Sequence, residues 1–483
     1  MKKKIVSIMF LAAMFTIGCD NNSDEFNNNH DAAYDVSPEA LLTNAEKQLV
    51  DEVTTGSVNF SPFRFFDQYW GQVIYNTESR YSLTSRTVTD NVWNELYRDV
   101  LGNLASASRL IEAEDVTNQA QHDNKLAIIE ILNVYTYQVL VDSFGDVPYT
   151  QALDPEIKLP AYDNDADIYP QLITRLDAAI AQLDTSAPSF GNAEMIYNGD
   201  VAHWIMFANS LKVKLGLNLA DVNPTLAQAT VESGYNGGVI LNNADNATFE
   251  YSSSAPNYNQ LYADLVASNR TDFVPAATIV NALNATNDPR ESVYFTQAAS
   301  GGYVGGVYGG TNTNFATLSQ IGNIFKTPDL PGQLMESTEV NLYLAEAAAR
   351  GYNVGNTAEF YYNQGVTESF RFWGLSDAQA ATYLAQPNVA YATAPGDFKQ
   401  KIGMQMWYSF YNRPFEEWNA YRRLDYPQLA APSNASSTAD GEVPKRLFYP
   451  INERTVNSEN YQAAVQAIGG SDRMKVHVFW DVN

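Results

Sequence analysis

The sequence predicts a mainly α-helical protein with minor β-structure, on three observations. Apolar residues recur at the three- and four-residue spacing of amphipathic helices through most of the chain. Residues that favour helix ends stand where these stretches begin and stop. One segment, residues 221–335, breaks every long period and is rich in glycine, asparagine and serine. Together these patterns predict packed helices around one loop-rich insertion with a few short strands.

The first predicted helix begins after Ser37. Serine suits the N-cap position, and Pro38 suits the first helical position, where an N–H has no intrahelical partner. The apolar residues that follow at helical spacing are Leu41, Leu42, Ala45, Leu49 and Val53. We therefore expect a helix with one apolar face.

Four more helical stretches precede the insertion, at residues 93–110, 126–141, 167–184 and 202–219. Gly145 and Pro148 follow the second stretch and stop its helix. The last stretch is apolar nearly all round, which is typical of a buried helix.

Helices resume at Ser337, after the insertion. Small residues along 339–350 face larger ones along 357–372 across a short turn. This arrangement resembles a tetratricopeptide pair, although the chain shows no clean period of about 34 residues. We expect residues 37–483 to form a single domain of tetratricopeptide-like helical pairs, with the loop-rich insertion at about 221–335.

Residues 1–18 are predicted to be a secretory signal peptide. Lys2, Lys3 and Lys4 precede a largely apolar run at 5–17. A helix of that length covers about 20 Å, which is too short for the roughly 30 Å core of a bilayer. The run is therefore not expected to span a membrane.

Cys19 is the only cysteine in the chain and follows this run directly. A lone cysteine in an exported protein cannot form an internal disulfide. Its position resembles a bacterial lipoprotein box, in which the cysteine is acylated and becomes the first residue, although Thr16 stands where leucine is usual. We expect Cys19 to be the lipidation site that holds the protein to a membrane, with the polar residues 19–36 as a flexible tether. The alternative is a soluble secreted protein with an incidental cysteine.

The composition limits the partners that the protein can bind. The chain has 55 acidic and 29 basic residues and a net charge of −26. This balance argues against nucleic acid and anionic membrane surfaces, because both need a basic footprint. The 30 tyrosines, 23 phenylalanines and 7 tryptophans suit a neutral, hydroxyl-rich ligand, although most of these rings must lie in the core.

No catalytic constellation, metal site or cofactor motif is predicted. The four histidines, His30, His122, His203 and His477, lie far apart and lack metal-ligand spacing. No Gly-x-Ser-x-Gly motif occurs, and the glycine run at 301–310 lacks the lysine of a phosphate-binding loop.

Asp163, Asp165 and Asp167 begin like a calcium-binding loop. The sixth position is Ile168 instead of glycine, and the twelfth is Thr174 instead of glutamate, so the pattern fails as an EF-hand. We expect these aspartates to complement the N-terminal dipole of the helix that follows.

Several short segments, taken in order, cover nearly the whole chain after residue 18. They are Trp93-x-x-Leu96-Tyr97, Phe144-Gly145-Asp146-Val147-Pro148-Tyr149, Tyr162-Asp163 before Ile168-Tyr169, Asp288-Pro289-Arg290, Glu339-x-x-Leu342-x-Leu344-Ala345-Glu346-Ala347, Gln405-x-Trp407, Glu417-Trp418-x-x-Tyr421-Arg422-Arg423, Phe448-Tyr449-Pro450 with Glu453, Asn460-Tyr461-x-x-Ala464 and Trp480-Asp481. Their ordered coincidence resembles the SusD/RagB family of surface nutrient-binding lipoproteins, in its SusD-like subgroup. Most of these motifs have plain structural interpretations. Arg422 and Arg423, for example, could cap a helix or pair with Glu416 and Glu417.

The resemblance implies an α-helical fold of tetratricopeptide-like pairs with loops wrapped over one side. It also implies a SusC-like TonB-dependent outer-membrane barrel as partner, over which such a protein sits as a lid. The segment Ser23-Asp24-Glu25 is similar to the export signal that places these lipoproteins on the cell surface.

The residues that contact ligand carry no transferable motif, so we select them from the chemistry of sugars. A sugar ring presents apolar C–H faces and a rim of hydroxyl groups, so its receptor needs exposed aromatic rings flanked by amides and carboxylates. Loop aromatics are better candidates than those on helix stripes. The candidates for ligand binding are Trp70, Tyr75, Arg80, Tyr81, Asn257, Tyr258, Tyr303 and Tyr308, with Asn259 as a further hydrogen-bonding group.

We therefore expect a non-catalytic protein that captures oligosaccharide and hands it to the barrel. A peptide or another nutrient is the alternative cargo, which the composition does not separate from a sugar. A surface glycoside hydrolase, and a structural gate without ligand affinity, are the rival functions from other classes.

Overall fold

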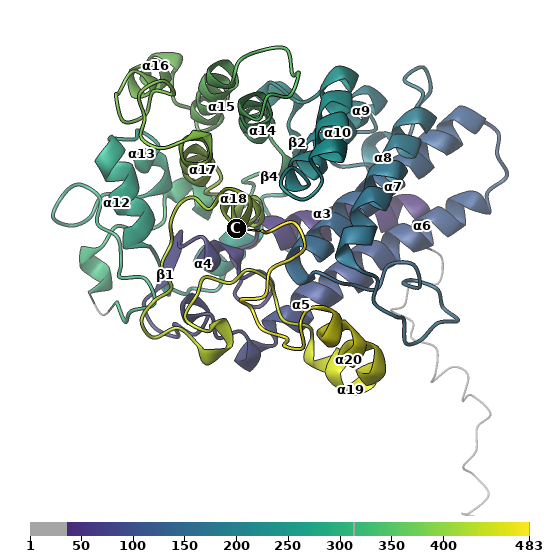
Figure 1. The fold of residues 1–483 in the computed structure, drawn as a ribbon, viewed down its shortest axis with the longest axis horizontal. Helices are drawn as coiled ribbons and strands as arrows, with labels where there is room; N and C mark the ends of the chain where they lie inside the picture. The colour runs from purple at the N-terminus through teal and green to yellow at the C-terminus, as the bar shows by residue number, and fades with distance from the viewer. Residues whose placement is uncertain (1–35, 313, 483) are drawn as a thin grey trace, which may run out of the picture. The chain divides into compact units, whose positions relative to one another are not determined.

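The computed structural model describes residues 36–312 and 314–482. The predicted signal peptide, Cys19 and the predicted tether up to residue 35 lie outside the described residues. Residues Pro38–Asn483 form one compact unit, whose secondary structure is mostly helical (Figure 1). The predicted mainly α-helical class with minor β-structure is confirmed.

Helices that follow one another in sequence pack together in the first half of this unit. α7 (Gln119–Phe144) packs on α8 (Asp165–Gln182). α9 (Val201–Asn218) packs on α10 (Pro224–Gly237). α3 (Pro38–Thr54) contacts a run of helix made of α5 (Val88–Asn94), the π-helical segment η3 (Glu95–Leu101) and α6 (Gly102–Glu112).

Local interactions set the ends of these helices, and α7 ends at Gly145 as the sequence predicts. Asn118 caps α7 by accepting a hydrogen bond from the N–H of Gln121. Gly145 ends the same helix with a φ of 78°, a conformation that favours glycine. Asp200 caps α9 in the same way as Asn118 caps α7.

The structure differs from the prediction at the start of the insertion. The sequence predicts loops from residue 221, yet α10 begins at Pro224 and packs along α9. Gly234 resembles a helix breaker in the sequence, but a Cβ at this position would lie 2.6 Å from the backbone oxygen of Asn209. The glycine therefore permits two helix backbones to approach closely, and it does not mark a turn.

The rest of the insertion consists of short elements joined by loops. These elements are β2 (Ala247–Phe249), α11 (Gln260–Tyr262), the π-helical segment η6 (Ala263–Ala267), β3 (Phe273–Pro275), α12 (Ala277–Thr286), α13 (Glu291–Tyr294) and β4 (Gly332–Met335). β3 pairs antiparallel with β1 (Trp70–Gln72), with Gly71 opposite Val274, and β2 pairs antiparallel with β4. The β1–β3 ladder thus joins an N-terminal loop to the insertion.

The C-terminal half is again a set of packed helices. They are α14 (Ser337–Ala349), α15 (Ala358–Phe372), α16 (Asp377–Leu384), α17 (Phe398–Ser409), α18 (Pro414–Leu424), α19 (Ile451–Val456) and α20 (Ser458–Ala467). α14 packs on α15 and on α17, and α17 packs on α18. A tetratricopeptide geometry for these pairs stays a prediction.

Short turns of helix connect the longer elements. α4 (Phe63–Phe66) is a single α-helical turn, and the 3-10 turns among the described residues are Glu78–Arg80, Thr84–Arg86, Gly191–Ala193, Asn243–Asp245, Phe315–Thr317, Asn323–Lys326 and Ser437–Ala439.

The apolar interior is divided into a large core between the helices and a smaller aromatic cluster under the insertion. In the smaller cluster the rings of Tyr294 and Tyr411 stack with centroids 4.5 Å apart. Trp70 of β1 and Phe273 of β3 belong to the same cluster. The insertion loops therefore extend from strands that pack on this aromatic cluster.

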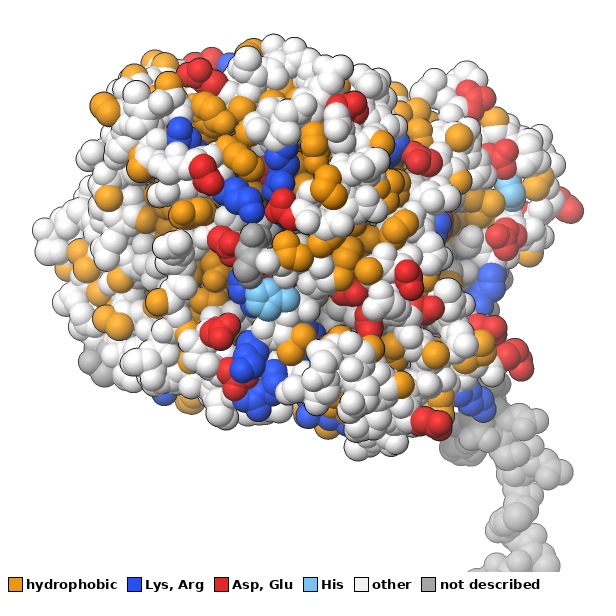
Figure 2. Space-filling model, viewed as in Figure 1, with side chains coloured by type: hydrophobic (Ala, Val, Ile, Leu, Met, Phe, Trp, Pro, Cys, Tyr) orange, Lys and Arg blue, Asp and Glu red, His pale blue; other side chains and the backbone are white. Residues whose placement is uncertain are grey.

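The face of the molecule in Figure 2 carries acidic and basic side chains scattered among uncharged ones, with no single basic patch. Among the described residues, no helix combines the length with the apolar composition that crossing a bilayer requires.

Candidate ligand-binding surface

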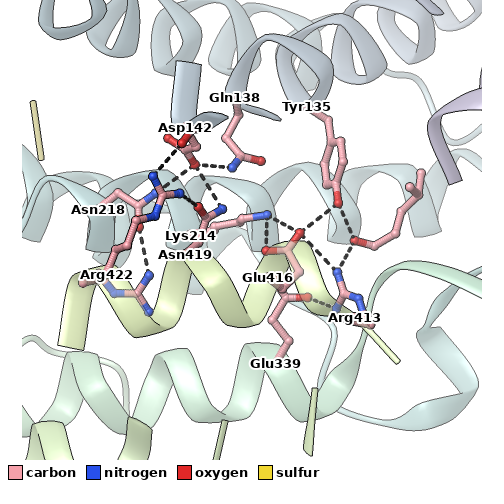
Figure 3. A network of polar contacts seen from close by, with 12 residues as sticks. Tyr135, Gln138, Asp142, Lys214, Asn218, Glu339, Arg413, Glu416, Asn419 and Arg422 are labelled. Atoms are coloured by element: carbon pink, nitrogen blue, oxygen red, sulfur yellow. Dashed lines mark hydrogen bonds and ion pairs between the residues drawn. The ribbon is translucent and has the colours of Figure 1, made fainter. Parts of the chain in front are cut away.

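The buried charged side chains of α18 lie between this helix and its neighbours (Figure 3). Glu416 lies 2.5 Å from the Nζ of Lys214 on α9 and accepts a hydrogen bond of 3.0 Å from the hydroxyl of Tyr135 on α7. Arg413, just before α18, forms an ion pair with Glu339 of α14. Burial alone would raise the pKa of Glu416, but Lys214 and Arg413 hold it below its ordinary value.

Arg422 occupies the other end of this buried network. Its guanidinium donates a hydrogen bond of 2.7 Å to the backbone oxygen of Asp142 and lies 3.5 Å from the centroid of the Trp418 ring. The carboxylate of Asp142 accepts hydrogen bonds from the hydroxyl of Tyr169 at 2.6 Å and from the indole of Trp480 at 2.8 Å. The family-like motif on α18 is therefore part of the scaffold.

The sequence offers two interpretations of Arg422 and Arg423, and the structure does not show the one in which they pair with Glu416 and Glu417. Arg423 pairs with Glu346 of α14 at 3.0 Å, and Glu416 pairs with Lys214. Sequence spacing favours partners within one helix, but these side chains are buried between helices and find their partners across the interface.

The aspartates of the calcium-like segment accept hydrogen bonds from backbone N–H groups. Asp163 accepts from Tyr149 and Thr150, both at 2.9 Å, and Asp165 at the start of α8 accepts from Phe479 at 3.0 Å. Across residues 36–312 and 314–482, no three His, Cys, Asp or Glu side chains are grouped so that they could hold a metal ion.

Two loops that are distant in sequence lie together beside the β1–β3 ladder. They are residues 73–80, after β1, and residues 303–310 of the insertion, and we call their exposed surface the loop face. The Nε of Arg80 donates a hydrogen bond of 2.8 Å to the backbone oxygen of Gly309. The amide of Asn76 donates one of 3.0 Å to the backbone oxygen of Gly310. Side-chain hydrogen bonds thus hold the two loops in fixed contact.

Tyr75 presents an aromatic ring to solvent on the loop face. Its side chain is 64% exposed, and its backbone has a φ of 56°. A bulky residue rarely adopts a positive φ, and such strained conformations concentrate at functional sites. The neighbouring side chain of Ile74 and that of Val307, on the second loop, are also exposed. The loop face therefore offers an apolar platform next to the hydrogen-bonding groups of Arg80.

Three other predicted residues support this face from within. Trp70 and Tyr81 have no exposed surface, and the indole N–H of Trp70 donates a hydrogen bond of 2.9 Å to the hydroxyl of Tyr411. Burial raises the pKa of Tyr81 to about 12. Tyr308 is half-buried, and its hydroxyl donates to the backbone oxygen of Phe65. The pairing of β1 with β3 helps to enclose Trp70, and the rings of Phe66 and Tyr308 pack against Tyr81, so neither ring has a face free for a ligand.

Tyr303 lies on the same insertion loop and lines a cavity of about 450 Å³. Its ring centroid is 6.2 Å from that of Phe295, which lines the cavity as well. Sequence reasoning missed Phe295, Gln297 and Asn323 as possible contact residues, because they follow short elements that no sequence period reveals.

Asn257 and Tyr258 are held by other contacts than those of the loop face. Asn257 is exposed, and its backbone oxygen accepts a hydrogen bond of 2.8 Å from Ser252. The ring of Tyr258 packs against Tyr262 with centroids 5.2 Å apart. Asn259 is buried as the N-cap of α11, where its side chain accepts a hydrogen bond. The predicted candidates therefore divide between the loop face, the Tyr303 cavity and this separate segment.

The described residues thus form a helical scaffold with buried polar side chains and an exposed aromatic ring on a loop. Residues 28–450 match the SusD-like family model described as "Starch-binding associating with outer membrane". The chain belongs to this SusD-like family.

Solved structures of similar fold agree with this assignment. A chitin-binding protein is 26% identical with a TM-score of 0.78, and the match covers 92% of this chain and 100% of that chain. A SusD homolog from Bacteroides uniformis is 28% identical with a TM-score of 0.79, covering 92% of this chain and 99% of that one. A chitin-binding SusD homolog from Flavobacterium johnsoniae shares the fold at 24% identity, with a TM-score of 0.76 over 92% of this chain and 98% of that one. No curated protein matches the chain.

Proposed function

We propose that this protein binds oligosaccharide at the cell surface without cleaving it and delivers it to a SusC-like TonB-dependent barrel. The family description and the chitin-binding relatives support a carbohydrate as ligand. The observation that carries the proposal is the exposed ring of Tyr75, held in a strained conformation beside Arg80 on the loop face.

The chemistry of this face suits a sugar. A flat aromatic ring can stack on the apolar C–H face of a pyranose, while N–H donors and amide oxygens bond its hydroxyl groups. Tyr75 supplies the ring, and Arg80 and Asn76 supply the polar groups. Because hydrogen bonds already fix both loops, little conformational entropy would be lost when the ligand binds.

Non-catalytic binding is supported by the nature of the side chains on the loop face. Cleavage of a glycosidic bond needs two carboxyl groups on opposite sides of the bond, whereas the one carboxylate of these two loops, Glu78, is buried. A glycoside hydrolase and a peptide-binding receptor are the two alternative functions that the test below distinguishes from sugar binding.

The test is calorimetric titration of the full chain with a panel of plant, host and microbial glycans and with mixed peptides, followed by chromatography of the mixtures. Binding of a glycan with no new product is the expected result. Cleavage of any glycan would overturn the non-catalytic part of the proposal. Binding of peptides alone would replace sugar by peptide as the cargo.

Attachment to the membrane is proposed from Cys19, and the barrel is proposed as a partner from the family. Acylation of Cys19 would fix the protein to the outer membrane, because several acyl chains on one residue anchor stably where a single chain is marginal. Labelled fatty acid should be incorporated into the wild-type chain and not into Cys19→Ala. The barrel should co-purify with the wild-type chain from detergent-solubilised outer membranes, and its absence there would remove the delivery step.

A further inference from the structure

A second cavity, of about 220 Å³, lies between α3, η3 and α11 and is lined by acidic side chains. Asp51 and Glu52 of α3 and Glu95 of η3 line it. Gln48 and Gln260 complete its polar wall, and Thr55 and Phe60 also line it. We call it the acid cavity. It is separate from the loop face and from the Tyr303 cavity, because it shares no lining residue with either.

The acidic side chains that α3 contributes to the cavity lie at the end of the helix where its dipole disfavours negative charge. Asp51 and Glu52 lie in the last turn of α3, which contains no basic residue. The C-terminal end of a helix carries partial negative charge and favours a cation. Two acidic side chains at this end, together with Glu95 from η3, therefore gather in a place that favours a cation.

The burial of Glu52 points to a ligand independently of the clustering of acidic residues. Its side chain is buried, with 1% of its surface exposed, and it lines the cavity. Neither of its carboxylate oxygens has a hydrogen-bond partner among the described residues. Buried polar atoms in native proteins are normally bonded, so a pair of unbonded oxygens facing a cavity indicates a missing partner.

The basic side chains near the cavity form ion pairs with acids other than Glu52. Lys47 lies 2.5 Å from Asp51, which also accepts a hydrogen bond of 2.6 Å from the hydroxyl of Tyr251. Arg98 lies 2.5 Å from Asp99. Burial first, and then the charges of Glu95 and Asp51, raise the pKa of Glu52 well above its ordinary value. Burial and then Asp99 raise the pKa of Glu95 to about 7, although Arg98 opposes this shift.

The size and lining of the cavity identify the kind of cation. A cavity of about 150 Å³ is large enough for benzene, so this one accepts several non-hydrogen atoms. Phe60 is 43% exposed and can contact a cation through its ring face. The amide oxygens of Gln48 and Gln260 can accept hydrogen bonds from N–H groups.

We propose that the acid cavity binds a small organic cation with a primary ammonium or guanidinium head, which pairs with Glu52 and Glu95 while its carbon chain lies against Phe60. This ligand is independent of the glycan on the loop face. The geometry does not favour a metal ion, because within the described residues no three acidic or histidine side chains are grouped for coordination.

The test titrates the full chain with n-butylammonium at pH 8, with n-butanol as the neutral analogue and calcium chloride as the metal. The variants are Glu52→Gln and Glu95→Gln. Glu46→Gln is the matched control, since Glu46 is a buried carboxylate on the same helix that does not line the cavity. Thermal unfolding checks that each variant folds. Glu52→Gln should fold at least as well as wild type, because it replaces a buried carboxyl group that has no hydrogen-bond partner among the described residues with a neutral amide.

We expect n-butylammonium to bind and n-butanol not to bind. Glu52→Gln and Glu95→Gln should each weaken the binding by about tenfold or more, and Glu46→Gln should stay within about twofold of wild type. The affinity should fall between pH 8 and pH 5 as Glu95, whose pKa is raised to about 7, becomes protonated. Equal binding of n-butanol, full binding by Glu52→Gln, or binding of calcium in place of the ammonium would each overturn the proposal. Glycan titration of the same variants should be unchanged, so failure here leaves the proposed function standing.

Discussion

The network around α18 and the loop face use polar residues in opposite ways. In the network, charged side chains such as Glu416 and Arg422 are buried, and each contacts partners on other helices. On the loop face, Tyr75 is exposed and strained while its neighbours hold the loops in place. The difference teaches that the motifs by which the family can be recognised maintain the fold, whereas ligand binding is proposed for residues that carry no motif.

The largest effect is expected from breaking the buried network. Glu416→Ala leaves Lys214 buried without its carboxylate partner, so the free energy of unfolding should fall by about 3–5 kcal/mol. Urea unfolding followed by tryptophan fluorescence measures this. The control is Glu359→Ala, an exposed glutamate on α15, which should change stability by less than about 0.5 kcal/mol. Equal stability of the two variants would mean that the network does not hold the scaffold.

The pH dependence of stability should come from buried carboxyls that remain outside such pairs. Burial raises the pKa of Glu336, just before α14, from 4.5 to about 7. The folded protein then holds this proton more tightly than the unfolded chain, so the stabilisation is full below pH 4.5 and is lost as the pH rises through about 7. We expect the melting temperature to fall between pH 5 and pH 8, and Glu336→Gln to reduce that fall. A melting temperature that rises with pH would contradict this.

Strain at Tyr75 predicts a gain of stability when the ring is removed. A non-glycine residue in the left-handed region costs about 1–2 kcal/mol, so Tyr75→Gly should raise the free energy of unfolding by about 1 kcal/mol. Phe360→Gly, which also removes an exposed ring but from within α15, should lower it by about 1 kcal/mol instead. The same urea titration compares both. A loss of stability in Tyr75→Gly would remove the argument that strain is kept there for function.

The smallest effect is expected at the separate segment of the insertion. Tyr258 packs against Tyr262 and makes none of the contacts described for the loop face. Tyr258→Ala should therefore keep glycan affinity within about twofold of wild type. A larger loss, measured by calorimetry, would extend the binding site to that segment.

Much of the fold could be predicted because helical spacing and capping residues are local signals. The end of α7 at Gly145 follows from the chemistry of a single residue, whereas α7 begins at Gln119, before the predicted stretch at 126–141. Gly234 could not be interpreted correctly, because a glycine needed for helix packing looks like one needed for a turn.

The site could be predicted only in part, for a related reason. Selecting loop aromatics includes the exposed Tyr75, but the burial of Trp70 depends on strand β3 and that of Tyr81 on Tyr308, both far away in sequence. The acid cavity likewise combines Glu52 with Glu95 and Gln260, whose proximity no local pattern reveals.

The most direct test of the account is a calorimetric titration of the glycan that binds wild type against two variants, Tyr75→Ala and Phe360→Ala. Each variant removes one exposed ring, and only Tyr75 lies on the loop face. The account predicts a loss of affinity of about tenfold or more for Tyr75→Ala, with Phe360→Ala unchanged. Undiminished affinity in Tyr75→Ala, with the protein folded, would contradict the claim that the loop face is the binding site.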